Sequence, residues 1–261
     1  MRRMKSPIKD TRFRHVCTTR LKSIIPVDSI DDAYGIFGGK LELSLAESDR
    51  TIKAVCLREM IYRFWYCLQE DAEQIYQIIM SRSFKFHGIS DLELLQQNLP
   101  TLKDPYYQAA VFFILNRCTN GGSISHGKLG LDNYSALALN YLRNFKKPEK
   151  FSLILREDYI NYIKTEQAFE TNEPVDFILF PHLHFSYNFF DYGKNSGYDT
   201  QRYNHGHLRG LLEATQKTIL IYRKHPSLIS FFKDFNIELI DKNGNSTNSL
   251  KHYEEAIVTN F

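Results

Sequence analysis

Short apolar segments that suit β-strands alternate with helical patterns along most of this chain, and this alternation limits the possible folds more than any other feature. A strand–helix–strand order places parallel strands side by side, with the connecting helices on the faces of the sheet. The last two strand patterns have no helical pattern between them and predict an antiparallel hairpin. We therefore expect an α/β protein with a mostly parallel, Rossmann-like sheet and a closing antiparallel hairpin. The predicted strands are residues 33–37, 52–57, 151–155, 177–180, 218–222, 236–240 and 256–259.

The helical patterns fall into two groups. Those that alternate with strands are residues 18–25, 40–47, 159–168, 205–216 and 227–234. The others follow one another without intervening strands, and they are residues 59–80, 92–98, 105–118 and 134–145. We assign residues 59–130 to a helical insertion, and residues 1–58 and 131–261 to the α/β domain.

Composition and charge are those of an ordinary soluble domain. The 261 residues are 43% hydrophobic and 24% charged, which suits a globule with an apolar core. The net charge of +3 is weak support for an anionic partner. The basic residues are unevenly placed, because residues 2–22 hold eight Lys and Arg residues and a single acid, Asp10. This N-terminal segment either contacts phosphates or is a solvated tail.

Cysteine spacing and hydropathy indicate a cytosol-like compartment. The cysteines lack the paired spacing of zinc sites and of disulfide frameworks, which predicts reduced and buried thiols. They are Cys17, Cys56, Cys67 and Cys118. No apolar run is long enough to cross a membrane, and no signal-peptide pattern is present. We expect a cytoplasmic protein with no membrane partner, located in the host cytoplasm or the virion if it is viral.

A buried strand pattern at residues 177–180 is followed by a proline, and we expect Pro181 to end this strand. Polar and aromatic residues come next, including histidines in two pairs: His182 with His184, and His205 with His207. Four histidines are able to form a metal site, but no Cys, Asp or Glu completes a known ligand spacing. We therefore predict that these histidines are unrelated polar residues and that the chain holds no metal.

The end of this strand resembles the catalytic strand of the Dam-type adenine-specific DNA methyltransferases, which ends in Asp-Pro-Pro-Tyr. Residues 110–122, 217–222 and 255–261 are similar to further segments of the family, in the same order, and the resemblance implies a class I methyltransferase fold. In the family, the acid accepts a hydrogen bond from the adenine amino group and the aromatic ring stacks on the flipped base. The four positions here are Phe180, Pro181, His182 and Leu183, so we expect no catalytic residue.

The cofactor positions of the family are altered as well. The resemblance implies that a glycine-rich N-terminal segment and a Glu-Pro-Phe-x-Gly-Gly-Gly-like loop bind S-adenosylmethionine, because glycine lets the backbone approach the ligand. No glycine precedes Gly35 here, and the acid after the second strand is displaced to Glu59. The altered loop positions are Phe37, Gly38, Gly39 and Lys40. We expect no cofactor. The alternative is an active S-adenosylmethionine-dependent adenine methyltransferase with an atypical motif.

Candidate contacts with nucleic acid lie near the family's Asn-Arg loop and in the polar loop before residue 205. They are Arg117, Asn120, Lys128, Lys194, Arg202 and Tyr203. A run of aromatic residues either stacks on bases or fills the space of a lost cofactor. It contains Phe185, Tyr187, Phe189, Phe190 and Tyr192.

One segment, Asp104-Pro105-Tyr106-Tyr107, matches the missing motif by its letters, but its context predicts a helix N-cap instead. The leading functional hypothesis is thus a catalytically inactive homologue that acts as a DNA-binding, structural or partner-subunit protein. We expect a protein partner or assembly, such as a phage or virus particle or a nucleoprotein complex, with DNA as a further possible partner.

Overall fold

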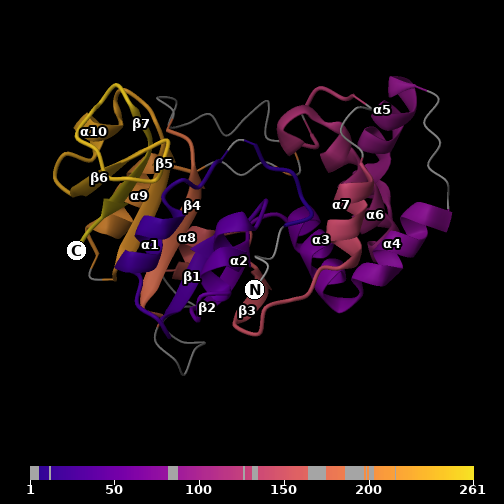
Figure 1. The fold of residues 1–261 in the computed structure, drawn as a ribbon, viewed down its shortest axis with the longest axis horizontal. Helices are drawn as coiled ribbons and strands as arrows, with labels where there is room; N and C mark the ends of the chain where they lie inside the picture. The colour runs from indigo at the N-terminus through magenta and orange to yellow at the C-terminus, as the bar shows by residue number, and fades with distance from the viewer. Residues whose placement is uncertain are drawn as a thin grey trace.

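The structure is a computed structural model. It describes residues 6–11, 13–81, 88–125, 127–130, 135–163, 175–185, 197, 199, 203–214 and 216–261. Its centre is one seven-stranded sheet with the order β3-β2-β1-β4-β5-β7-β6 (Figure 1). The strands are β1 (Ile30–Tyr34), β2 (Thr51–Cys56), β3 (Phe151–Leu155), β4 (Phe177–Leu183), β5 (Thr218–Arg223), β6 (Asn236–Asp241) and β7 (Tyr253–Thr259).

Strand directions confirm the predicted fold class. The neighbouring pairs among β3, β2, β1, β4 and β5 are all parallel, while β7 pairs antiparallel with both β5 and β6. A mostly parallel sheet closed by an antiparallel hairpin is the Rossmann-like, methyltransferase-like fold that the resemblance implies. The strand patterns located the sheet well because parallel strands are buried on both faces and are therefore apolar along their length.

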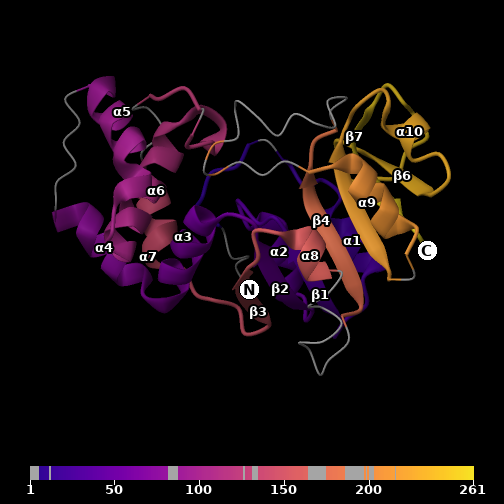
Figure 2. The same cartoon turned by 180° about the vertical axis from the view of Figure 1, so that it is seen from behind.

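Helices cover both faces of the sheet (Figures 1 and 2). On one face lie α1 (Thr18–Ile24) and α2 (Lys40–Ala46), and on the other lie α8 (Tyr159–Asn161), α9 (His205–Leu212) and α10 (Leu228–Phe231). Because successive strand residues point to opposite faces, the two cores divide the strands between them. Ala33 and Leu179 enter the first core, whereas Tyr34 and Phe180 enter the second.

A block of helices stands beside the sheet (Figure 1). It contains α3 (Glu59–Glu70), α4 (Ala72–Ser81), α5 (Ile89–Asn98), α6 (Pro105–Cys118) and α7 (Ala136–Arg143). α6 is its central helix, because it packs against α3, α4 and α5 and is buried along most of its length. Among the described residues, no helix is long and apolar enough to cross a membrane.

β4 continues through Pro181, so the prediction that this proline ends the strand is wrong. β4 pairs with β1 only as far as Leu179, and its register with β5 shifts between Phe180 and Leu183. A proline is tolerated where the ladder is interrupted, because no backbone N–H is required there. As a result, β4 carries His182 to the carboxyl edge of the sheet.

Two further boundaries differ from the predictions. The helical pattern of residues 59–80 is divided at Asp71, which has φ −154° and ψ 87° and whose Oδ1 accepts a hydrogen bond from the Gln74 N–H at 2.9 Å. Aspartate favours such local bonds over a helix interior. The first strand begins at Ile30 rather than at residue 33, because two acids near its start, Asp31 and Asp32, are buried in the sheet.

Candidate ligand site at the carboxyl edge of the sheet

The loops that follow β1 and β4 meet at the carboxyl edge of the parallel strands, where open α/β sheets bind their ligands. The loop after β1 spans residues 35–39 and leads directly into α2. Gly35 and Gly39 have φ values of 79° and 66°, in the left-handed region that favours glycine. The loop therefore has a backbone shape that larger residues would adopt only under strain.

Side chains of the protein itself pack closely on this loop. A Cβ atom built on Gly35 would lie 1.8 Å from the hydroxyl oxygen of Tyr203. A Cβ atom built on Gly38 would lie 2.7 Å from the Cβ of Asp10, which comes from the N-terminal segment. These two glycines thus make room for side chains of this chain.

The third glycine of the loop accommodates Trp65 from α3. A Cβ atom on Gly39 would lie 2.5 Å from the Trp65 ring, and the Trp65 Nε1–H donates a hydrogen bond to the Phe37 carbonyl oxygen at 3.0 Å. Trp65 is fully buried. Its indole thereby fixes the loop from the side of the helical block and fills the space beside it.

Phe180 of β4 is the centre of an aromatic cluster. Its ring stacks on Tyr34, with a centroid distance of 4.9 Å and an interplanar angle of 15°. Tyr159 and Tyr203 each contact Phe180 edge to face at 5.6 Å. Tyr162 completes the cluster beside Tyr34 at 6.4 Å. Such offset and edge contacts add to the apolar burial of the rings, so this part of the edge is a packed core.

Polar side chains meet on the other face of the same edge. His182 Nε2 lies 2.7 Å from Oε1 of Glu42, a residue in the first turn of α2. The His182 ring also contacts two rings of the N-terminal segment, His15 at 4.9 Å and Phe13 at 5.3 Å between centroids. Glu42 is inaccessible to solvent, and His182 and His15 are only 8% and 5% exposed. The end of β4, the first turn of α2 and the N-terminal segment are therefore in direct contact.

The part of the N-terminal segment that crosses this edge is here called the strap, residues 6–11 and 13–17. Hydrogen bonds tie one of its ends to the helical block, where Lys9 N–H donates to Asn116 Oδ1 at 2.7 Å and Thr11 N–H donates to the Gly121 carbonyl at 3.2 Å. At its other end, the Cys17 N–H donates to Glu255 Oε2 on β7 at 3.1 Å. The strap therefore spans the distance between the helical block and the sheet.

Three candidate nucleic-acid residues that the structure describes lie together after α6. Arg117 is in the last turn of α6, and burial lowers the pKa of its guanidinium. The Asn120 N–H donates to the Lys128 carbonyl at 2.8 Å, and both side chains are exposed. Lys9 of the strap joins them, since its Nζ donates to the Thr119 carbonyl at 3.0 Å. Lys194 and Arg202 lie outside the described residues.

The remaining residues discussed from the sequence are the aromatic run that begins at Phe185, the Asp104 segment and the histidines. Phe185 is buried and stacks on His205 at 4.9 Å, whereas Tyr187, Phe189, Phe190 and Tyr192 lie outside the described residues. Asp104 caps α6, because its Oδ1 accepts a hydrogen bond from the Tyr107 N–H at 2.6 Å. Within the part of the chain that the structure describes, no group of three His, Cys, Asp or Glu side chains is placed to hold a metal ion.

A surface hollow of about 360 Å³ lies beyond the end of β3. It is lined by Glu59, Leu155, Arg156, Glu157, Asp158 and Asn161. Arg156 packs over the Tyr162 ring at 4.9 Å, which links this hollow to the aromatic cluster. The hollow is thus polar and displaced from the glycine loop.

Comparison with known proteins adds little to these observations. No protein-family profile matches the chain, and no curated protein matches it. Among solved structures, the chain is similar to the rRNA methyltransferase aviRa from Streptomyces viridochromogenes, with 13% identity over 92% of this chain and 80% of that chain, and a TM-score of 0.36. That similarity is too low to bear on function, so the fold class rests on the order and direction of the strands.

Three residues that shape this site were not singled out from the sequence: His15, Glu42 and Trp65. Tyr203 was predicted as a nucleic-acid contact, but its ring packs in the aromatic cluster against Tyr159 and Phe180. Glu42 gave a usable signal, because a carboxylate on the apolar face of a predicted helix suggests a buried partner. His15 gave none. Its φ of 52° is unusual for a residue other than glycine and is visible only in the structure.

Proposed function

We propose that this chain is a catalytically inactive relative of the Dam-type adenine-specific DNA methyltransferases, kept as a binding or structural component. One observation supports the proposal above all. Side chains of the protein occupy the carboxyl edge from both faces, with Tyr203, Asp10 and Trp65 against the glycine loop. S-adenosylmethionine would have to displace them in order to reach that loop.

The chemistry of the strand end supports the same proposal. Phe180 has no atom able to accept a hydrogen bond from an adenine amino group, and its ring is engaged by Tyr34. His182 is directed at Glu42, so its Nε2 is not free to orient a substrate. Loss of one oriented polar contact costs about 10²- to 10³-fold in rate. Loss of the acid together with the aromatic ring leaves no route to efficient methyl transfer by the family's mechanism.

A calorimetric titration with S-adenosylmethionine tests this proposal, with an active Dam-type enzyme as the positive control. We expect no binding in the micromolar range and no radioactive methyl transfer to duplex oligonucleotides. Micromolar binding that disappears in Gly39→Trp would support the alternative, an active methyltransferase with an atypical motif. The retained left-handed conformations of Gly35 and Gly39 favour that alternative.

We further propose that the retained activity is binding to DNA, on the surface formed by Arg117, Asn120 and Lys128. Lys9 and the half-buried Arg117 are two neighbouring cations; burial lowers the pKa of Lys9, and the charge of Arg117 adds to that shift. Such a pair favours the approach of a phosphate. Attachment to a phage or virus particle, or to an active partner subunit, remains a prediction from the sequence.

Salt dependence of binding to a duplex oligonucleotide tests this second proposal. Affinity should fall steeply with salt, and Lys128→Ala should reduce the slope of log K against log salt by about 1. Lys233→Ala is the matched control, because Lys233 is equally exposed but follows α10 at the opposite end of the molecule (Figure 1). A flat salt response would contradict the proposal.

A further inference from the structure

Three buried polar side chains from three separate elements meet where the strap crosses the carboxyl edge. Glu42 comes from α2, His182 from β4 and His15 from the strap. One hydrogen bond joins Glu42 to His182, and the two imidazole rings pack edge to face with an interplanar angle of 84°. These contacts hold the centre of the strap, whereas its ends are held by backbone hydrogen bonds.

The cluster is not fully satisfied. Within the described residues, one atom of each side chain is buried without a hydrogen-bond partner: Oε2 of Glu42, Nδ1 of His182 and Nδ1 of His15. An unsatisfied buried polar atom costs about 1–3 kcal/mol. A cluster with three such atoms is a poor means of stabilising a fold. It is well suited to a contact that has to open.

The strap is under backbone strain at the same point. His15 has φ 52°, which lies in the left-handed region that is uncommon for residues other than glycine. The two residues that precede it are bound to the body of the protein. Lys40 Nζ donates to the Arg14 carbonyl at 2.8 Å, and the Phe13 ring stands against His182. Release of the strap would therefore relieve strain at His15.

We propose that Glu42, His182 and His15 form a proton-operated latch, which holds the strap over the carboxyl edge while His15 is neutral and releases it when His15 takes up a proton from solvent. The charged and titratable groups around His15 come from each packed element: His182 on β4, and Lys40 and Glu42 on α2. Glu255 on β7 holds the end of the strap through Cys17. A cationic His15 would be buried and would face both His182 and the cation of Lys40, which disfavours the closed strap.

The direction of the pH effect follows from the linkage of protonation to closure. Burial lowers the pKa of His15 well below 6.5 in the closed state, and His182 and Lys40 act in the same direction. The released strap is solvated, so its histidine returns to an ordinary pKa. Closure is then fully stable above pH 6.5 and weakens as pH falls below it. Because one proton is taken up per opening, the opening constant should rise by up to about tenfold per pH unit.

Hydrogen–deuterium exchange of the full chain between pH 7.5 and pH 5 tests the latch. The reporters are the backbone amides of Lys9, Thr11 and Cys17, whose hydrogen bonds hold the strap. After correction for the intrinsic exchange rate, we expect their protection to be constant above pH 6.5 and to fall by up to tenfold per pH unit below it. The amides of Ile219, Leu220 and Ile221 in β5 should stay protected, which separates strap release from global unfolding.

Two variants identify the proton site. His15→Gln should make the protection of the strap independent of pH, whereas His207→Gln, which alters an exposed histidine of α9, should leave the pH response unchanged. The proposal would be overturned if protection of the strap amides in the natural chain did not change with pH. It would also be overturned if the pH response persisted in His15→Gln. The test involves no cofactor and no DNA, so the latch and the proposed function can fail separately.

Discussion

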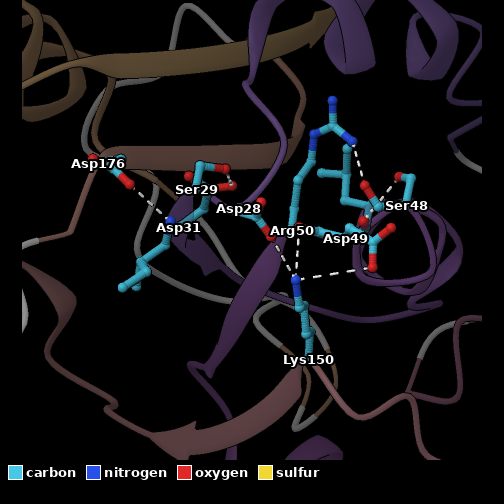
Figure 3. Close-up of polar contacts among 10 residues, drawn as sticks. Asp28, Ser29, Asp31, Ser48, Asp49, Arg50, Lys150 and Asp176 are labelled. Atoms are coloured by element: carbon cyan, nitrogen blue, oxygen red, sulfur yellow. Dashed lines mark hydrogen bonds and ion pairs between the residues drawn. The ribbon is translucent and has the colours of Figure 1, made fainter.

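The two ends of the parallel sheet carry opposite kinds of polar chemistry. At the amino edge, Arg50 donates hydrogen bonds to the carbonyls of Ile25, Lys22 and Ser48, and Lys150 pairs with Asp28 at 2.7 Å (Figure 3). At the carboxyl edge, the polar groups of the latch are buried and incompletely bonded.

The two edges differ in how completely their buried polar groups are hydrogen-bonded. Buried polar groups that only support a fold are normally satisfied, because unsatisfied ones are costly. The amino edge mostly follows that rule through bonds between neighbouring loops, although Oδ1 of Asp31 is buried without a hydrogen-bond partner among the described residues. The carboxyl edge departs from it at the cluster of Glu42, His182 and His15. The contrast is what the proposed latch predicts, because a contact that has to open is left incompletely bonded.

The largest effect that sharpens this comparison is expected at Arg50. Arg50→Met should lower the free energy of unfolding by about 3–5 kcal/mol, because it removes the donor from three carbonyls in two segments, the end of α1 and the turn before β2. Urea unfolding measures the change. Arg143→Met is the control, since Arg143 forms an exposed ion pair with Glu73 and its loss should have little effect. If Arg50→Met lowered the free energy of unfolding as little as Arg143→Met, the hydrogen bonds of Arg50 would not be what stabilises the amino edge.

A second prediction concerns Asp31 on β1. Burial raises the pKa of Asp31 to about 7, with Ser29 opposing the shift and the charge of Asp176 adding to it. Because the folded pKa lies above the unfolded value of 3.8, Asp31 favours folding below pH 4, and this contribution is lost as pH rises to about 7. Asp31→Asn should therefore gain stability relative to the natural chain as pH rises from 4 to 8, by about 2–4 kcal/mol.

The measurement is urea unfolding at pH 4, 6 and 8. Glu93→Gln, a change at an exposed acid of α5, should show no such gain with pH. If the free energy of unfolding of Asp31→Asn follows that of the natural chain at all three pH values, Asp31 is ionised in the folded protein. The amino edge would then contain a buried charge, which would contradict the contrast drawn between the two edges.

The third prediction tests how closely side chains pack on the glycine loop, residues 35–39. Gly35→Ala should cost about 2–3 kcal/mol, because the new methyl group meets the Tyr203 hydroxyl and because φ is 79°. Tyr203→Phe removes that hydroxyl and should itself cost about 1 kcal/mol or less. In the double variant, the combined cost should be smaller than the sum by at least 0.5 kcal/mol, and only the backbone strain at residue 35 should remain. Additive costs would mean that the loop is open to a ligand.

The sequence predicted the sheet well and the site poorly, for one physical reason. Strands such as residues 151–155 were located because burial on both faces leaves an apolar pattern within a few consecutive residues. His182 and Glu42 are 140 residues apart, and Lys9 and Asn116 are 107 apart. No local pattern encodes such pairs. The sequence indicated that Phe180 has no catalytic chemistry, whereas its position at the centre of an aromatic cluster required the structure.

The smallest effect is expected at Lys150, and it decides which part of the amino edge is structural. Lys150 contacts Asp28 and Asp49, yet both acids are 75% exposed, and water and salt screen such pairs (Figure 3). Lys150→Met should therefore change the urea midpoint by little more than the error of the measurement, and raising the salt concentration should remove even that difference. A large loss that persists in high salt would mean that the surface pairs, and not Arg50, hold the loops at the amino edge together. The contrast between the two edges would then lie in surface charge, and the unsatisfied cluster at the carboxyl edge would no longer set that edge apart.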